Sequence, residues 1–338
     1  MIELDNSIKN SLKNYKFIDL FAGVGGFRIA LESFGAQCVF TSEWDKNCQR
    51  IYEKNFNDIC HGDITKIEEV EIPDHDIICA GFPCQAFSIS GKQKGFEDSR
   101  GTLFFDIIRI AKYHQPRLLI LENVKNFERH DNGNTLKVVL SALDEIGYEV
   151  KYKVLNASMF GIPQSRKRIF IVGINKQFSG SFSEYEIPDG NGKKTTMEDF
   201  LLPNSEVEKK CFIDSFELDD FIENNAKIEK DIFGNYNQKP IRLGIVNKGG
   251  QGERVYSTKG HSITLSAYGG GIFSKTGGYL VDNKIRKLSP RECARLTGFP
   301  DSFMLSENLN HSWKQFGNSV VVDVIQEILF TLIGKKLV

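Results

Sequence analysis

The sequence of 338 residues lacks any long apolar run, and this absence limits the kind of protein it encodes. No stretch approaches the roughly 20 apolar residues that a membrane-spanning helix needs. Residues 1–10 are polar and contain no apolar segment typical of a signal peptide. Hydrophobic residues make up 41% and charged residues 26% of the chain, as in ordinary globular proteins. We therefore expect a cytoplasmic protein without membrane association, built from one large and one small domain.

Paired cysteines are also missing. The seven cysteines are scattered, and no two have the C-x-x-C spacing of a zinc or redox site. The H-x-E and P-C-x-x-C pattern of zinc deaminases is absent as well. We therefore expect no bound metal, and we expect most of the cysteines to be buried free thiols.

The net charge of −1 gives no hint of a polyanionic partner, but the distribution of charge does. The segment Pro240–Gly298 contains ten Lys and Arg residues against three Asp and Glu residues, whereas Glu198–Asp231 is rich in acidic residues. A basic segment beside an acidic one indicates a face that binds nucleic acid. Charge alone leaves an ordinary solvated loop region as an equal alternative.

The first half of the chain alternates apolar runs with segments of helical spacing. This alternation predicts an α/β domain with an open, mostly parallel sheet and helices on both faces. In such sheets, ligands bind at the carboxyl ends of the strands. The predicted strands are 16–21, 38–44, 75–81, 117–122, 149–155 and 168–174, and the predicted helices are 26–34, 47–55, 102–114 and 134–146.

The second half has a different composition. Residues 180–196 resemble a linker, and residues 240–281 are rich in Gly, Ser and Thr, which predicts short strands and shaped loops. Residues 319–333 have apolar positions at helical spacing, and we expect this helix to pack on the α/β domain.

A glycine turn follows the first predicted strand, in Asp19-Leu20-Phe21-Ala22-Gly23-Val24-Gly25-Gly26. Glycines let a backbone approach a ligand closely. The third glycine of the dinucleotide pattern G-x-G-x-x-G is missing, which weakens the interpretation as an NAD-dependent oxidoreductase. Glu43 would hold ribose hydroxyls, Trp44 would offer a ring to an adenine, and Asp63 would accept from its amino group. A nucleoside ligand fits this set.

Three reactive groups follow at other predicted strand ends. Cys84 lies in Gly81-Phe82-Pro83-Cys84-Gln85, and its thiol needs nearby positive charge to become a nucleophile. Glu122 ends the next strand, and Arg166 and Arg168 precede the last one at alternate positions. A surface patch or a structural ion pair would explain the arginines or Glu122 separately, but neither explains their common place at strand ends.

These motifs resemble those of the cytosine-5 DNA methyltransferase family. They recur in the family's order over nearly the whole chain, together with Gly317-Asn318-Ser319-Val320. The resemblance implies a Rossmann-like S-adenosylmethionine-dependent methyltransferase sheet with helices on both faces, plus a smaller, mostly β target-recognition domain. It implies a catalytic domain over 1–195 with 317–338, a target-recognition domain over 196–290 and a hinge over 291–316.

The resemblance also implies a covalent mechanism. The Cys84 thiolate would add to carbon 6 of a cytosine flipped out of double-stranded DNA, and Glu122, carrying a proton in a buried site, would support ring nitrogen 3. Arg168, with Arg166 near, would favour the thiolate and fix the base. Carbon 5 would then take a methyl group from S-adenosyl-L-methionine, leaving S-adenosyl-L-homocysteine. The implied cofactor-binding residues are Phe21, Gly23, Val24, Gly26, Glu43, Trp44, Asp63, Ile64, Gly81, Leu103, Asn318 and Ser319.

For DNA, the resemblance implies contacts from Ser90, Gln251, Arg254, Ser266 and Tyr268. Gln251 would fill the vacated space in the duplex, and Arg254 would read a guanine, although a phosphate contact remains an alternative. The stretch Gly249–Pro300 resembles in particular one bacterial member, which implies GCGC as the site with its first cytosine as target. Departures from that member at Lys259, His261 and Ser262 concern flanking preferences.

These implications describe the monomeric modification enzyme of a restriction-modification system, paired with a restriction endonuclease of the same specificity. Two alternatives remain open. An RNA cytosine-5 methyltransferase would use the same scaffold, and the small domain discriminates between them. A catalytically silent DNA-binding protein would not need Cys84, Glu122 and Arg168 intact.

Overall fold

The computed structural model of the chain describes residues 6–83, 103–213 and 239–338. The chain folds into two compact units. The first, called here the α/β unit, comprises Ile2–Leu155, Lys167–Asp189 and Ile325–Val338. The second, called the small-sheet unit, comprises Asn156–Arg166 and Gly190–Val324. Four points along the chain therefore separate segments that fold with different partners.

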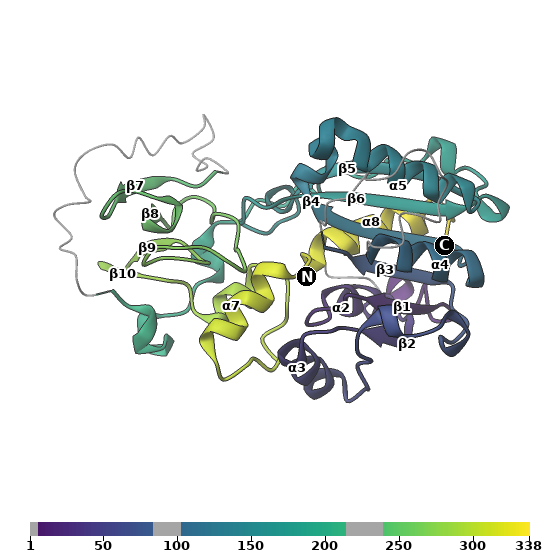
Figure 1. The fold of residues 1–338 in the computed structure, drawn as a ribbon. Helices are drawn as coiled ribbons and strands as arrows, with labels where there is room; N and C mark the ends of the chain where they lie inside the picture. The colour runs from purple at the N-terminus through teal and green to yellow at the C-terminus, as the bar shows by residue number, and fades with distance from the viewer. Residues whose placement is uncertain (1–5, 84–102, 214–238) are drawn as a thin grey trace. The chain divides into compact units, whose positions relative to one another are not determined.

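The α/β unit is built on a six-stranded sheet with the order β2-β1-β3-β4-β6-β5 (Figure 1). The strands β1, β2, β3 and β4 pair in parallel, as the alternation of strands and helices predicted. Strand β6 runs antiparallel to β4, with Glu122 opposite Phe170. The strands are β1 (Lys16–Leu20), β2 (Gln37–Ser42), β3 (Ile77–Gly81), β4 (Leu118–Val124), β5 (Tyr148–Asn156) and β6 (Lys167–Asn175).

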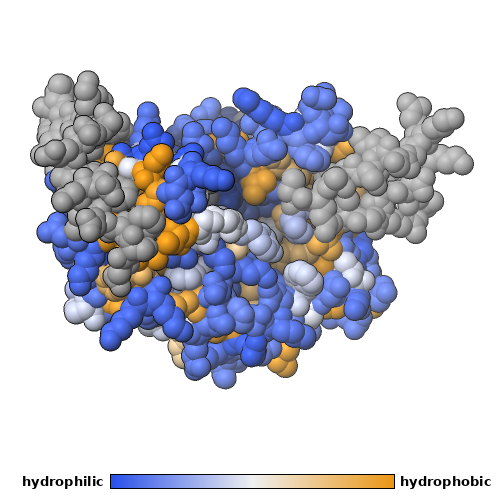
Figure 2. Space-filling model, turned by 60° about the vertical axis from the view of Figure 1, so that its left-hand side comes forward, coloured by the Kyte–Doolittle hydropathy of each residue, from blue (hydrophilic) through white to orange (hydrophobic). Residues whose placement is uncertain are grey.

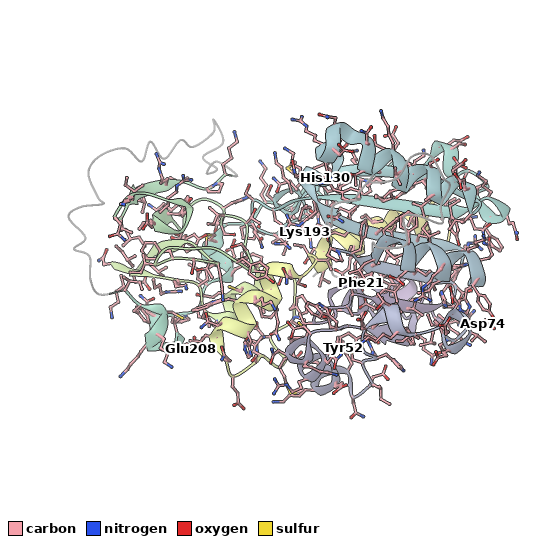
Figure 3. All side chains as sticks on the ribbon, viewed as in Figure 1. Phe21, Tyr52, Asp74, His130, Lys193 and Glu208 are labelled. Atoms are coloured by element: carbon pink, nitrogen blue, oxygen red, sulfur yellow. The ribbon has the colours of Figure 1, made fainter. Side chains whose placement is uncertain are left out.

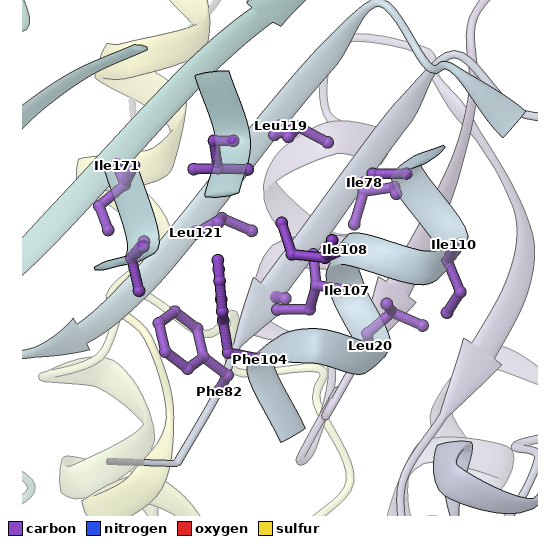
Figure 4. Close-up of a cluster of buried hydrophobic side chains, with 14 of the residues drawn as sticks. Leu20, Ile78, Phe82, Phe104, Ile107, Ile108, Ile110, Leu119, Leu121 and Ile171 are labelled. Atoms are coloured by element: carbon purple, nitrogen blue, oxygen red, sulfur yellow. The ribbon is translucent and has the colours of Figure 1, made fainter. Parts of the chain in front are cut away.

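Alternate residues of the central strands point to opposite faces of this sheet, and both sets are buried. One set packs against α4 and α5, where Phe104, Ile107 and Leu121 belong to a single hydrophobic cluster (Figure 4). The helix α8 lies across the other face of the sheet in Figure 1, and its Gln326 donates to the Ser33 hydroxyl at the end of α2. The helices are α1 (Asn6–Lys9), α2 (Gly26–Glu32), α3 (Lys46–Phe56), α4 (Leu103–His114), α5 (Asn134–Glu145) and α8 (Val322–Gly334).

The small-sheet unit contains a four-stranded sheet with the order β10-β9-β8-β7. Its small core is formed around Val255, Phe273 and Ile285. Short strands and turns rich in glycine are what the composition of this region predicted. The elements are β7 (Arg242–Ile245), β8 (Arg254–Ser257), β9 (Gly278–Val281), β10 (Lys284–Arg286), α6 (Pro290–Arg295) and α7 (Leu309–Asn318).

Among the residues that the structure describes, one stretch, Leu309–Gly334, is long and apolar enough by composition to cross a membrane. In the structure this stretch is divided between α7 and α8, and Ile325, Ile328 and Leu332 of α8 are fully buried. Core helices commonly pass the same test, so the stretch gives only weak evidence for a membrane segment. The face drawn in Figure 2 is mostly hydrophilic, with hydrophobic residues in small patches. Apart from the antiparallel strand β6, the α/β unit has the predicted Rossmann-like sheet with helices, and the second unit contains a small sheet.

Candidate active site

The glycine turn after β1 has a backbone that only a few residue types tolerate. Phe21, Gly23 and Gly25 all have positive φ angles, of 57°, 57° and 89°. A Cβ at Gly25 would lie 2.4 Å from Cε2 of Phe56, so the turn is packed directly against α3. A Cβ at Gly23 would meet no atom within 4 Å. The turn therefore packs against α3 at Gly25 and has free space beside Gly23. A turn that binds a ligand is expected to have both features.

Glu43 follows β2 and holds this turn in place. Its Oε2 accepts a hydrogen bond of 2.9 Å from the backbone N–H of Gly23, and its Oε1 accepts one of 2.7 Å from the N–H of Asp45. Burial raises the pKa of this carboxyl, while the bonds from Asp45 and Gly23 lower it. Each carboxylate oxygen has a second lone pair, so the bonds to Gly23 and Asp45 are compatible with the predicted contact to ribose hydroxyls.

The remaining predicted cofactor residues of the α/β unit lie in the turns after β1 and β2, at a short 3-10 helix, and where β3 ends and α4 begins. Trp44 directly follows Glu43, and its side chain is 76% exposed. Asp63 uses Oδ1 to cap a short 3-10 helix through the N–H and hydroxyl of Thr65, at 3.1 and 2.9 Å. In Figure 3, Phe21 is labelled beside β1 and Tyr52 on α3. Val24, Gly26 and Ile64 are buried, and Gly81 and Leu103 end β3 and begin α4.

Two side chains meet at the carboxyl end of β4. Nε of Arg168 lies 3.1 Å from Oε1 of Glu122, and the two side chains are only 17% and 9% exposed. Glu122 is the register partner of Gly81, the last residue of β3. This position places the ion pair at the strand edge from which the Pro83-Cys84-Gln85 segment departs. Glu122 is buried, as its predicted role requires. Cys84 and Ser90 themselves lie outside the described residues.

One side chain that was not predicted orders the backbone at Phe82, two residues before Cys84. The amide of Asn123 donates a 2.9 Å hydrogen bond to the carbonyl of Phe82. The Phe82 ring is itself packed between Phe104 and Phe127, with ring centroids 5.6 and 5.5 Å away. The chain is thereby fixed two residues before Cys84. The Glu-Asn-Val motif carries the signal, because an amide directly after the predicted catalytic carboxyl at a strand end indicates a positioning role.

A buried polar cluster behind the glycine turn was also missed. Asp19, the fourth of the five residues of β1, is fully buried, and burial raises the pKa of its carboxyl to about 8. Arg28 lies close enough to lower that pKa partly, and it forms ion pairs with Glu32 at 2.6 Å and Asp58 at 2.8 Å. Its guanidinium also lies 4.6 Å from the centre of the Phe56 ring. An aspartate inside an apolar strand was the available signal.

The predicted arginine pair divides between the two units. Arg166, in the small-sheet unit, is 2% exposed, and its Nη1 donates to the carbonyl of Leu265 at 3.0 Å. Its Nη2 donates to the carbonyls of Gly317 and Ser319, at 3.1 and 2.7 Å. Two nitrogens of Arg166 thus bind the protein's own backbone, whereas Arg168 binds Glu122. The predicted effect of Arg166 on the Cys84 thiolate stays a prediction.

The other predicted residues of the small-sheet unit lie in turns and at element ends. Asn318 is exposed, while Ser319 is buried and donates to the carbonyl of Val320 at 3.1 Å. Arg254 begins β8 and its Nε is 3.4 Å from the carbonyl of Gly249. The Ser266 hydroxyl donates to the carbonyl of Tyr268 at 2.7 Å, and the Tyr268 side chain is 74% exposed. Gln251 lies in a short 3-10 helix that precedes β8.

Comparisons with known proteins agree with this arrangement. The family model described as C-5 cytosine-specific DNA methylase matches residues 15–334. The chain is 54% identical over 332 residues to Type II methyltransferase M.HhaI of Haemophilus parahaemolyticus, covering 98% of this chain and 97% of that protein. It is 42% identical over 339 residues to Type II methyltransferase M.HpaII of Haemophilus parainfluenzae, covering 97% and 90%.

Similar solved structures are more distant in sequence. A crystal structure of a Spodoptera frugiperda DNMT2 variant has a TM-score of 0.70 at 19% identity, covering 94% of this chain and 99% of that one. A putative DNA modification methyltransferase encoded within an E. coli prophage has a TM-score of 0.65 at 22% identity, covering 95% and 99%. These two likenesses concern the fold alone. The sequence matches, the family's motifs and the sheet that carries them together establish that the chain belongs to the C-5 cytosine-specific DNA methylase family.

Proposed function

We propose that this enzyme transfers a methyl group from S-adenosyl-L-methionine to carbon 5 of a cytosine flipped out of double-stranded DNA. The observation that carries the proposal is the buried Glu122–Arg168 ion pair beside the end of β3, from which the chain leads to Cys84. A carboxyl and a guanidinium at that edge supply the acid and the cation that covalent addition to a pyrimidine requires.

In the proposed mechanism, the sulfur of Cys84 bonds to carbon 6 of the cytosine, and the electron pair of the ring shifts towards carbon 5 and nitrogen 3. Glu122, which is paired with Arg168 in the free enzyme, takes up a proton when the cytosine binds, holds this proton towards nitrogen 3 and stabilises the charge that develops there. Arg168 orients Glu122 and fixes the base through its oxygen. After methylation of carbon 5, the proton at that carbon passes to water, the electron pair of the broken C–H bond re-forms the double bond between carbons 5 and 6, and Cys84 leaves as a thiolate, which restores the aromatic ring.

The residues around the glycine turn fit the proposed cofactor, whose sulfonium supplies an electrophilic methyl group when bound. Gly23 is open where a side chain would otherwise stand, and Glu43 is held by two backbone N–H groups. The exposed ring of Trp44 offers an aromatic face for an adenine. Val24, Gly26, Asp63, Ile64, Gly81 and Leu103 complete the proposed set in this unit, and Asn318 and Ser319 belong to it by resemblance.

For DNA, the proposal assigns target recognition to the small-sheet unit. Arg254 would read a guanine of GCGC, Tyr268 and Ser266 would contact the duplex from a second loop, and Gln251 and Ser90 would stabilise the flipped state. The 54% identity to M.HhaI supports this assignment. The RNA alternative is not favoured, because the matching family model is described as a DNA methylase and its match spans the region of the proposed reading loops.

The cellular context follows from the same relatives, which are named Type II methyltransferases. We propose that the enzyme is a cytoplasmic monomer that protects host DNA from a restriction endonuclease of the same specificity. We also propose a catalytic domain over 1–195 with 317–338, a target-recognition domain over 196–290 and a hinge over 291–316.

Bisulfite sequencing of plasmid DNA from cells expressing the enzyme tests the function directly. We expect 5-methylcytosine at the first cytosine of GCGC and unmodified cytosine elsewhere, with an Arg168→Ala variant as the inactive control. Methylation at another sequence would refute the proposed specificity. An unmodified plasmid, from cells that contain folded protein, would refute the proposed function.

The role of Arg254 needs a separate test, because a phosphate contact would also explain its position. We expect Arg254→Ala to weaken binding to the cognate duplex by about 1–3 kcal/mol and binding to random DNA much less. An equal loss on both duplexes would assign Arg254 to the phosphate backbone.

A further inference from the structure

The segment Pro163–Arg166 runs beside the segment Ser262–Leu265 inside the small-sheet unit. The N–H of Ser262 donates to the carbonyl of Pro163 at 2.7 Å, and the N–H of Ser165 donates to the carbonyl of Ser262 at 2.9 Å. The Gln-Ser-Arg part of the family motif therefore pairs through backbone hydrogen bonds with the segment that leads into the loop Ser266–Tyr268. This loop is a proposed DNA-reading loop.

Leu265 is the residue before this loop, and both its backbone N–H and its backbone carbonyl form hydrogen bonds to side chains. Its N–H donates to Oε1 of Gln164 at 3.2 Å, and its carbonyl accepts from Nη1 of Arg166 at 3.0 Å. Gln164 in turn donates to the carbonyl of Leu296 at 2.7 Å, and both Gln164 and Arg166 are buried. Losing a hydrogen bond from a buried polar group is costly, because the group cannot form a replacement hydrogen bond with water. The base of the loop is thereby fixed.

The same guanidinium holds a second segment. Nη2 of Arg166 binds the carbonyls of Gly317 and Ser319, which flank Asn318 at the end of α7. The two segments also touch directly, since a Cβ at Gly317 would lie 2.4 Å from the N of Ala267 and 2.6 Å from the carbonyl oxygen of Ser266. The planar fork of arginine suits this bridge, because its donors point in fixed, different directions.

We propose that Arg166 is a positioning residue that couples DNA binding at the Ser266–Tyr268 loop to cofactor binding at Asn318 and Ser319. This inference rests on the proposed roles of those two segments. If either segment moves, the Arg166 guanidinium moves with it, and its hydrogen bonds to the second segment change. When DNA orders the Ser266–Tyr268 loop, Arg166 therefore holds Asn318 and Ser319 in place for the cofactor, and the cofactor has the same effect on the loop. The coupling is reciprocal by thermodynamic necessity: each ligand tightens the other by the same factor.

The test measures binding, because a loss of activity would not separate positioning from chemistry. The dissociation constant of a GCGC duplex is measured with and without saturating S-adenosyl-L-homocysteine, which allows no turnover. For the wild type we expect the duplex to bind about ten-fold more tightly with the analogue, within the usual range of coupling. For Arg166→Lys we expect this ratio to fall to within about two-fold of one, because one ammonium cannot span three carbonyls.

Arg291→Lys is the matched control. Arg291 also donates through both Nη atoms to two backbone carbonyls of this unit, those of Pro300 and Phe303, at 3.2 and 2.7 Å. These carbonyls differ from the three that Arg166 binds, so Arg291→Lys should keep the wild-type ratio. A second variant, Gly317→Ala, adds a methyl group against the backbone of Ser266 and Ala267 and leaves the charge of Arg166 unchanged. We expect this variant to lower the ratio as well.

The outcomes separate this inference from the proposed function. A wild-type ratio retained in both Arg166→Lys and Gly317→Ala would overturn the inference, as would a wild-type ratio of one. In either case, methylation of GCGC by the wild type in the bisulfite assay would leave the proposed function standing. An equal fall of the ratio in Arg291→Lys would show a general loss of order and would also overturn the inference.

Discussion

The buried pair Arg286–Glu292 allows a quantitative prediction, because the structure defines every contact it makes. Both side chains are fully buried, and the pair is bidentate, with N–O distances of 2.7 and 2.8 Å. Each oxygen of Glu292 also accepts a backbone N–H, one from Leu202 at 2.8 Å and one from Ser289 at 2.7 Å. Glu292 is thus surrounded by four donors.

The perturbation is Glu292→Gln, which keeps the shape and removes the charge. The amide nitrogen must replace one of the two oxygens, so it faces two of the four donors, and the charge of Arg286 loses its partner. Breaking a buried pair in this way costs about 3–5 kcal/mol. Asp144→Asn is the control, because its ion pair with Lys176 has the same 2.7 Å distance but lies on the surface, 71% exposed at Asp144. Exposed pairs contribute less than about 1 kcal/mol.

Urea unfolding followed by far-UV circular dichroism, which reports on both units, measures both effects, and tryptophan fluorescence follows the small-sheet unit separately. The chain has two tryptophans, of which Trp313 lies in the small-sheet unit and is 6% exposed, whereas Trp44 is 76% exposed. The change in emission therefore reports mainly on the unit that contains the buried pair. If Glu292→Gln lowers the free energy of unfolding no more than Asp144→Asn does, the reasoning about desolvated charge is wrong for this protein.

Three further predictions concern the α/β unit. Glu122→Gln should keep DNA binding but lower kcat by about 10²–10⁴-fold, which is the usual contribution of a general acid. An unchanged rate of methylation in a single-turnover assay would contradict this role. Gly25→Ala should unfold at lower urea concentration than Gly23→Ala, because both have positive φ but only Gly25 would place its Cβ against a ring; equal midpoints would contradict this. The pKa of Asp19 is raised from its usual 3.8 to about 8, so the folded state binds the extra proton and its stability should decline as the pH rises from about 4 to about 8. Asp19→Asn should remove that part of the decline in urea unfolding measured at several pH values, and an identical pH profile would count against it.

Much of the α/β unit could be predicted from hydrophobic periodicity, because its strands are buried runs and its helices are amphipathic. The direction of β6 could not, since a run such as Ile169–Ile174 is equally apolar in either orientation. The helix α7 was also missed. Its sequence is rich in Asn, His, Ser, Lys and Gln, and only Trp313 and Phe316 indicate a buried face.

The candidate site was predictable as a set of motifs but not as a set of contacts. The alternation of Arg166 and Arg168 predicted one shared face, yet the two side chains bond to different partners: Arg168 pairs with Glu122, and Arg166 binds backbone carbonyls about 100 and 150 residues away in the chain. Tertiary contacts of this kind leave no local pattern, because a carbonyl acceptor is the same in every residue. Asp19 was visible as an exception in an apolar strand, but its pKa depends on burial that the sequence does not show.

The division of the chain at four points has a practical consequence for building chimeric enzymes. Residues 190–324 form a continuous stretch that is tempting to exchange between relatives as a cassette, but Asn156–Arg166 folds with it. A cassette without that short segment would keep the host's Gln164 bonded to Leu265 at the base of a foreign loop Ser266–Tyr268, the proposed DNA-reading loop. Grafts that transplant both pieces together should therefore yield working specificities more often than grafts of the longer piece alone.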